Sequence, residues 1–147
     1  MKFRFLWVGK TKNRHWLALQ EEYLKRLSHF VKCEILEIKE GVNKTEESNR
    51  ILKSLNQNGF VVLLDERGKA LSSQKLAEQL QKWQSSSLKE IIFIIGSHEG
   101  VNSEVARRAH FSLSLSVMTF THDMARVILL EQLYRAFTIT KGFPYQK

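Results

Sequence analysis

Three short segments combine residue types and spacing that suit a pocket for a flat ligand. The first is the glycine-containing turn Gly96–Gly100, which follows an apolar run. The second is Leu64-Asp65, which ends the apolar run from Phe60, and the third is the stretch Leu115–Phe120. Because ligands of parallel α/β sheets bind beyond the carboxyl ends of the strands, we expect these segments to line one cleft. Glycine allows close approach of a group such as adenosine, although an ordinary turn explains the first segment equally well.

Several familiar catalytic and binding motifs are incomplete in this sequence. Gly9-Lys10-Thr11 resembles the end of a phosphate-binding P-loop, but the earlier glycine that the motif requires falls at Arg4. The segment Gly96–Gly100 has His98 at its centre, where a hydrolase nucleophile elbow needs serine. His98-Glu99 is followed by Asn102, where a zinc protease needs its second histidine. No G-x-G-x-x-G follows the first strand, so nothing supports dinucleotide binding of the usual kind.

The histidines and the cysteine do not form a metal site. Cys33 is the only cysteine, so it cannot form an internal disulfide, and its place in the strand-like run Lys32–Lys39 favours a structural thiol in a reducing compartment. The N-terminus lacks the features of a signal peptide, and no apolar run approaches the ~20 residues that span a bilayer. We expect a soluble, cytoplasmic protein without a metal. The five histidines, which show no ligand spacing, are His15, His29, His98, His110 and His122.

A surplus of basic residues predicts a polyanionic partner. Lys and Arg total 23 against 15 Asp and Glu, which gives a formal net charge of +8 in 147 residues. Such a charge attracts nucleic acid without reading its sequence, and ribosomal or transfer RNA is the natural candidate. Lys10, Lys12 and Arg14 cluster between a predicted strand and a predicted helix. They either contact phosphates or belong to an ordinary solvated loop.

The last predicted helix and the tail after it hold further candidate residues. Arginines on an otherwise apolar helix usually find a carboxylate or a phosphate, which makes Arg126 and Arg135 candidates. Glu131, four residues before Arg135, could instead pair with it on the helix surface. His122 is a candidate general base or a helix cap. Tyr145 could stack on a base or donate a hydrogen bond, although seven terminal residues are often disordered.

Strand-like and helical patterns alternate along the chain, which predicts an α/β fold with a mainly parallel sheet in a single domain, 1–147. The last helix is apolar almost all round, so it must be covered on more than one side, and a second subunit is a natural cover. We therefore expect a homodimer. The predicted strands are Lys2–Val8, Cys33–Ile38, Phe60–Asp65, Glu90–Gly96 and Phe111–Phe120; the predicted helices are 13–30, Asn43–Asn58, 72–83, Asn102–His110 and Asp123–Thr140.

Taken together, these segments resemble a known family over essentially the full length of the chain. The sequence is similar to the bacterial large-subunit ribosomal RNA methyltransferases of the RlmH type, within the SPOUT superfamily. No single segment is decisive, but their order and spacing are specific. The segments are Leu64–Lys69, Ile95–Gly100, Ser112–Phe120, His122–Val127, Glu131–Ile139 and Pro144-Tyr145.

The resemblance implies a fold and a chemistry that composition does not. It implies a sheet whose C-terminal part is tied in a deep trefoil knot, a rare feature of proteins. It implies a homodimer that uses S-adenosylmethionine to methylate N3 of a pseudouridine in ribosomal RNA of assembled ribosomes. Together with the candidates identified above, this gives Tyr145, Arg135 and His122 as the expected catalytic residues, and Lys10, Lys12, Arg14 and Arg126 as the expected RNA-binding residues. The cofactor-binding residues are Leu64, Gly96, Leu115, Ser116, Val117, Met118, Thr119 and Phe120.

The chain departs from the pattern of this family at two places. The tail of the family commonly reads His-Pro-Tyr-His, whereas Phe143 and Gln146 stand here in place of the histidines. Ser97-His98 stands where the family often has Gly-Pro. Two rival functions therefore remain. One is a ribosome-associated factor that kept the fold and lost catalysis with the tail histidines, and the other is an unrelated α/β hydrolase or nucleotide-binding protein. For Val117 and Met118, a plain core position is the alternative to cofactor contact.

Overall fold

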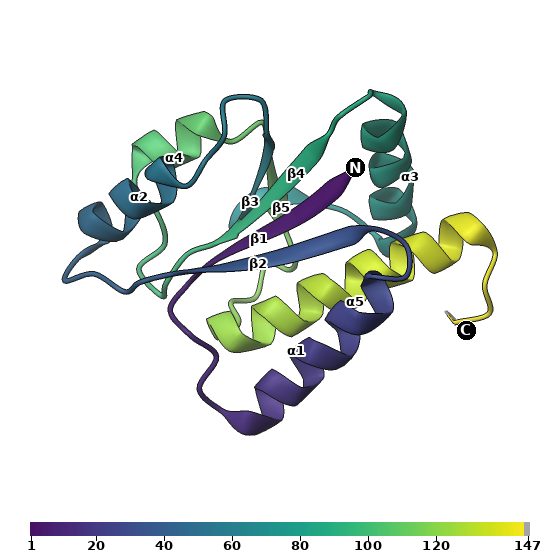
Figure 1. The fold of residues 1–147 in the computed structure, drawn as a ribbon, viewed down its shortest axis with the longest axis horizontal. Helices are drawn as coiled ribbons and strands as arrows, with labels where there is room; N and C mark the ends of the chain where they lie inside the picture. Colours follow the sequence, from purple (N-terminus) through teal and green to yellow (C-terminus); the bar gives the residue numbers. More distant parts are fainter. Residues whose placement is uncertain (146–147) are drawn as a thin grey trace.

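Strands and helices alternate throughout residues 1–145, the part of the chain that the computed structural model describes (Figure 1). Side-chain caps begin the helices where the sequence predicts them. The Asn13 side chain accepts from the backbone N–H groups of His15 and Trp16, and the Ser72 hydroxyl accepts from that of Lys75. The elements are β1 (Lys2–Val8), α1 (Arg14–Leu27), β2 (Lys32–Ile38), α2 (Lys44–Lys53), β3 (Phe60–Ala70), α3 (Ser73–Ser85), β4 (Glu90–Ile95), α4 (Ser103–Arg108), β5 (Phe111–Ser114) and α5 (His122–Lys141).

The strands form one parallel sheet in the order β2-β1-β4-β3-β5. The central strands β1 and β4 pair from Lys2 with Glu90 to Trp7 with Ile95. They are covered on both faces, which explains why β4 is a continuous apolar run instead of an alternating one. The predicted fold class, a mainly parallel sheet flanked by helices, is confirmed.

Helices cover both faces of the sheet, and alternate residues of β1 belong to different layers. Phe3 and Phe5 pack in the larger core cluster, under α1, α3 and α5, whereas Leu6 and Val8 pack in the smaller one, under α2 and α4. Figure 1 shows these two helix groups on opposite sides of the strands. Because parallel strands all end at the same edge, the loops after β1, β3, β4 and β5 gather there.

Helix α5 is covered largely by its own chain. Leu129, Leu130, Leu133 and Phe137 are buried in the larger core cluster, and the helix contacts both α1 and α3. The all-round apolar character of this helix therefore does not require a second subunit, which removes that argument for a homodimer.

Three predicted boundaries differ from the structure by about five residues or more. The helix predicted to reach Asn58 ends at Lys53, and the strand predicted over Phe111–Phe120 ends at Ser114. Strand β3 continues beyond Asp65, but its pairing with β5 shifts between Leu64 and Lys69. Gly68 lies inside this irregularity, where an added Cβ atom would come within 2.7 Å of the Ser112 backbone. The close approach of two backbones therefore accounts for glycine at this position.

Candidate functional site

Residues 63–67 of β3, at its irregular pairing with β5, and the loops that follow β4 and β5 surround a cavity of about 770 Å³ at the carboxyl edge of the sheet. The first turn of α5 closes one side, because His122 and Ala125 also line the cavity. Seven of the eight residues predicted to contact a cofactor are part of its wall; these are Leu64, Gly96, Leu115, Ser116, Met118, Thr119 and Phe120. The three segments identified in the sequence thus meet at one place.

The turn after β4 presents backbone to this cavity. Gly100 has a φ of +77°, a left-handed conformation that favours glycine, and its N–H donates to the Ser97 carbonyl at 2.8 Å. At Gly96 an added Cβ atom would lie 3.1 Å from the Val101 side chain and 3.2 Å from the Gly100 backbone. The two glycines therefore permit this tight turn, and Ser97, His98 and Glu99 between them also line the cavity.

The loop between β5 and α5 forms a second wall. The Ser116 hydroxyl accepts from the Met118 N–H at 3.0 Å, and the Ser116 carbonyl accepts from the Ser114 hydroxyl at 2.9 Å. Val117 and Met118 are 86% and 72% exposed, so the alternative that they are core residues is wrong. Val117 is not among the residues that line the cavity.

His122 is the first residue of α5 and lies at the cavity wall. Thr121 caps the helix instead, because its hydroxyl accepts from the Met124 N–H at 3.3 Å. The alternative of His122 as the helix cap is therefore wrong. Its Nε2 atom lies 3.8 Å from Oδ1 of Asp123, an acidic group in the same helical turn.

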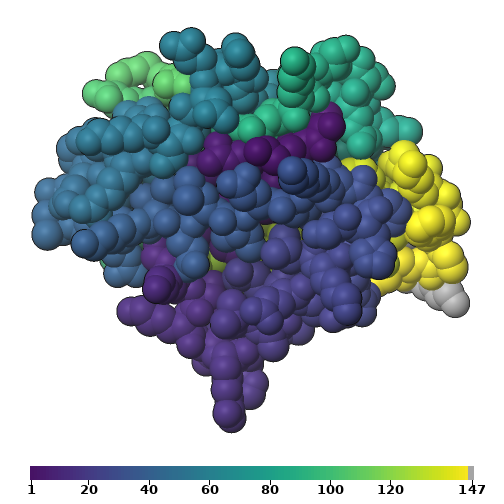
Figure 2. All heavy atoms as spheres, viewed as in Figure 1, coloured from purple at the N-terminus to yellow at the C-terminus, as the bar shows by residue number. Residues whose placement is uncertain are grey.

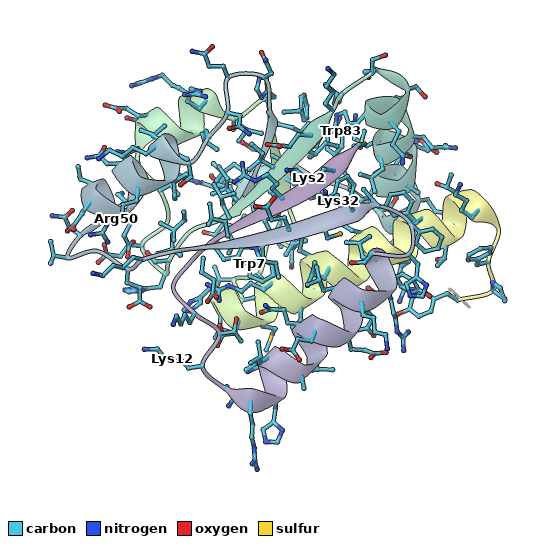
Figure 3. All side chains as sticks on the ribbon, in the orientation of Figure 1. Lys2, Trp7, Lys12, Lys32, Arg50 and Trp83 are labelled. Atoms are coloured by element: carbon cyan, nitrogen blue, oxygen red, sulfur yellow. The ribbon has the colours of Figure 1, made fainter. Side chains whose placement is uncertain are left out.

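Arg126 is fully buried, and its guanidinium joins α5 to the loop after β1. Nη2 donates to the carbonyl oxygens of Val8 at 2.7 Å and Gly9 at 3.2 Å, while Nη1 donates to Oγ1 of Thr11 at 2.8 Å. The guanidinium also lies 5.2 Å from the centre of the buried Trp7 ring, which Figure 3 marks between the sheet and α5. Burial lowers the pKa of Arg126. A guanidinium enclosed in this way cannot reach an RNA phosphate, so the prediction of Arg126 as an RNA-binding residue is wrong.

Arg135 and Tyr145 meet at a second place, around Glu131. Glu131 Oε1 accepts from the Tyr145 hydroxyl at 3.1 Å and from Nε of Arg135 at 2.9 Å. The helix-surface pair of Glu131 and Arg135 that the spacing suggested is therefore present, and it raises the pKa of Arg135. The Arg135 guanidinium lies 5.0 Å from the Tyr145 ring centre, and Oη of Tyr23 lies 3.5 Å from that of Tyr145. Neither Arg135 nor Tyr145 lines the cavity.

The surroundings of Tyr145 determine its protonation state. Burial, helped by the hydrogen bond with Tyr23 and by the Glu131 carboxylate, raises the pKa of its phenol well above the ordinary value. The phenol is therefore a hydrogen-bond donor near neutral pH. Gln146, which replaces a tail histidine, and Lys147 lie outside the described residues.

The basic segment Lys10–Arg14 is a projecting surface loop. Lys10, Lys12 and Arg14 are all exposed, and Figure 3 shows Lys12 pointing away from the body of the protein. In Figure 2 the purple region that contains this loop and the start of α1 projects at the lower edge. The loop follows β1, so it lies at the same edge of the sheet as the cavity.

Sequence reasoning missed cavity residues that come from outside the three segments. Ala125 lies three residues after His122, so helical spacing could have added it to the site. Lys44 lies in the first turn of α2 and reaches the cavity only because α2 packs beside the turn after β4. Nothing in the local sequence signals this contact.

Two negative findings concern residues 1–145. In this part of the chain no group of three or more His, Cys, Asp or Glu side chains is placed to hold a metal ion. Within the same residues, no helix combines the length and apolarity needed to cross a membrane.

Comparisons with known proteins connect this geometry to a chemistry. The model of a family described as predicted SPOUT methyltransferase matches residues 1–146. Proteins named ribosomal RNA large subunit methyltransferase H are 42% identical in Desulfotalea psychrophila and 38% identical in Ureaplasma urealyticum, and each match covers 100% of both chains. The crystal structure of tRNA (m1G37) methyltransferase from Aquifex aeolicus superposes with a TM-score of 0.58 at 19% identity, over 92% of this chain and 70% of that one. At that identity the structural likeness shows the fold alone.

Proposed function

The chain belongs to the SPOUT methyltransferase family and is a methyltransferase, and we propose that it transfers a methyl group from S-adenosylmethionine to N3 of a pseudouridine in large-subunit ribosomal RNA. The observation that carries this proposal is the full-length match, at 42% identity, to a protein named ribosomal RNA large subunit methyltransferase H. The basic surface loop and the cavity at the sheet edge are the features that such an activity needs. The proposal includes action on assembled ribosomes in the cytoplasm.

The cavity suits the methyl donor in size and chemistry. Its volume of about 770 Å³ lies within the roughly 300–1,000 Å³ of small-molecule pockets. Leu64, Leu115, Met118 and Phe120 supply apolar wall for the adenosine, and the backbone at Gly96 allows close approach. S-adenosylmethionine supplies a methyl group that its sulfonium already activates. The protein therefore needs mainly to orient the two reactants and to remove the N3 proton.

The candidate catalytic residues divide these tasks according to their surroundings. His122 is at the cavity wall, so we assign it removal of the N3 proton. The raised pKa of Tyr145 keeps its phenol neutral, which suits stacking on the target base, or donation to it once the proton is released from Glu131, better than proton removal. Arg135, held by Glu131, supplies positive charge beside that tyrosine. This assignment requires neither of the tail histidines that the chain lacks.

A homodimer would bring the two groups of catalytic residues together. Within one chain Tyr145 and Arg135 lie outside the cavity that His122 lines, so the tail of one chain would serve the cavity of a second copy. The exposed apolar side chains of Val117, Met118 and Phe120, beside the cavity, are a natural contact surface for that copy. Sedimentation of the purified protein should give twice the monomer mass of 17.2 kDa.

The first experiment tests the cofactor and the reaction. Calorimetry should show binding of S-adenosylmethionine and S-adenosylhomocysteine, and absence of binding at millimolar concentration would refute the proposal. Nucleoside mass spectrometry of ribosomal RNA from a deletion strain should lack one methylated pseudouridine, which the wild-type chain restores. If the chain binds the cofactor but the modification profile does not change, the substrate assignment is wrong. If it binds ribosomes without transferring a methyl group, the rival function as a non-enzymatic factor is correct.

The second experiment tests the basic loop. Replacing Lys10, Lys12 and Arg14 by Gln should raise KM for ribosomes and reduce its dependence on salt, because fewer counterions are released on binding. The affinity for the cofactor should not change, since the cavity is left intact. The control variant removes the same formal charge elsewhere by replacing the exposed lysines Lys53, Lys82 and Lys89. An equal effect of both triple variants would show that only net charge matters.

A further inference from the structure

Helix α2 lies beside the turn after β4, and a buried carboxylate joins the two. Glu47, in the first turn of α2, is 7% exposed. Its Oε1 atom accepts from the Ser97 hydroxyl at 2.8 Å, a contact between residues 50 positions apart. Ser97 is itself part of the cavity wall. The carboxylate therefore touches the site through one intermediary side chain.

The same helix holds the other end of this turn. Oγ of Ser48, which is fully buried, accepts from the backbone N–H of Asn102 at 3.0 Å. Asn102 in turn caps α4, since its side chain accepts from the Val105 N–H. Two adjacent residues of α2 thus fix the segment Ser97–Asn102 at both ends. Between these ends the only internal bond described is the one from Gly100 to the Ser97 carbonyl.

Glu47 is well compensated where it is buried. Its second oxygen, Oε2, accepts from the Gly41 N–H at 3.1 Å, so both carboxylate oxygens have donors. The positive end of the α2 dipole also favours a negative charge in the first turn. A buried carboxylate without such partners would be strongly destabilising. The Glu47 carboxylate is therefore held in place at both oxygens. The turn between Gly96 and Gly100 has fewer hydrogen bonds of its own.

We propose that Glu47 is a positioning residue for the methyl donor: through Ser97 it holds the turn at Gly96–Gly100 in the conformation that the adenosine requires. This inference rests on the proposed function, because it assigns the cavity to S-adenosylmethionine. It predicts that loss of the Ser97–Glu47 hydrogen bond loosens the turn and weakens donor binding, while the fold and the RNA surface remain intact.

The first test removes the hydroxyl and leaves the carboxylate. Ser97→Ala should raise the Kd for S-adenosylhomocysteine, measured by calorimetry, by about tenfold, since a hydrogen bond to a charged acceptor is lost. Ser97→Thr, which retains a hydroxyl, should bind nearly as the wild type does. Ser103→Ala makes the same change at an exposed serine in the first turn of α4 and should have no effect. In the methylation assay, KM for the donor should rise and KM for ribosomes should not.

The second test separates positioning from general stability. Hydrogen exchange of the ligand-free protein should be faster at residues 97–102 in Ser97→Ala, and unchanged in the core strands. A double-mutant cycle then combines Ser97→Ala with Glu47→Ala. The two effects on Kd should be strongly non-additive, because either change breaks the same contact.

The outcomes distinguish the inference from the function on which it rests. If wild-type protein binds neither S-adenosylmethionine nor S-adenosylhomocysteine, the proposed function fails. If the wild type binds and Ser97→Ala binds equally well, or if the two effects in the cycle simply add, the positioning role of Glu47 is refuted. Should Glu47→Ala fail to fold, the calorimetry and hydrogen exchange of Ser97→Ala alone decide.

Discussion

Replacement of Arg126 by Met tests the most heavily bonded buried group of the site region. The change removes three hydrogen bonds from a charged donor, to the carbonyls of Val8 and Gly9 and to the hydroxyl of Thr11. It also leaves the carboxylate of Asp123, 3.6 Å from Nη1, without its counter-charge. Breaking a buried hydrogen-bonded charge typically costs about 3–5 kcal/mol. Because the free energy of unfolding of a domain is roughly 5–15 kcal/mol in total, the variant should still fold but be much less stable than the wild type.

Urea denaturation of Arg126→Met measures this loss directly. The midpoint should fall with little change in the slope, and the melting temperature should drop by about 10 °C. Arg126→Lys keeps the charge but lacks the fork that reaches both the carbonyls and the hydroxyl, so it should lose about half as much. Arg107→Met, at an exposed position in α4, is the control and should change little.

An unchanged stability of Arg126→Met would support the earlier prediction that Arg126 binds RNA. If Arg126→Met keeps wild-type stability but binds ribosomes poorly, the guanidinium is available to RNA and the buried network does not hold the loop. A stability loss below about 1 kcal/mol would equally refute the reasoning, because it is no larger than the net value of one ordinary hydrogen bond.

Four further predictions test other parts of the structure. Burial raises the pKa of the Cys33 thiol to about 11, so thiol reagents should react slowly at pH 8 and faster as the pH approaches 11; a rate equal to that of the unfolded chain would contradict this. Gly68→Ala forces the Ser112 backbone to move and should cost about 1–3 kcal/mol in urea denaturation. Thr121→Ala removes the α5 cap and should cost about 1 kcal/mol by the same assay. Tyr145→Phe should remove a strongly alkaline step from the ultraviolet titration of the protein, because the pKa of Tyr145 is raised.

Local sequence patterns predict most of the fold and three of the segments that line the cavity. Apolar runs with capping residues predict each strand and helix, and the rule that ligands bind beyond parallel strands brings Leu64, Gly96 and Leu115 together. The strand predicted to continue to Phe120 is wrong because alternating Ser with apolar residues also suits an exposed loop held by serine hydroxyls. The trefoil knot that the family resemblance implies stays a prediction.

Tertiary contacts account for what the sequence could not predict. Arg126 has the local features of an RNA contact, and only the packing of α5 against the loop after β1 shows its burial. Glu47 and Lys44 look like ordinary charges at a helix start, yet α2 brings Lys44 to the cavity and Glu47 to Ser97, a residue 50 positions further along the chain. The periodicity of apolar residues does not predict contacts between residues so far apart in the sequence, because these contacts depend on the order of the strands in the sheet.

The covering of the larger core by α5 has a consequence for synthesis of the chain. This helix follows in sequence every strand that it helps to bury, so during translation the apolar face formed by Phe3, Phe5 and Phe93 is covered only by α1 and α3 until α5 has emerged. Most pairings in the sheet are also distant in sequence, which slows folding. A nascent chain in this state exposes aromatic surface of the kind that chaperones recognise. Cotranslational folding should therefore be late and cooperative, with protease resistance acquired in a single step when the last helix docks.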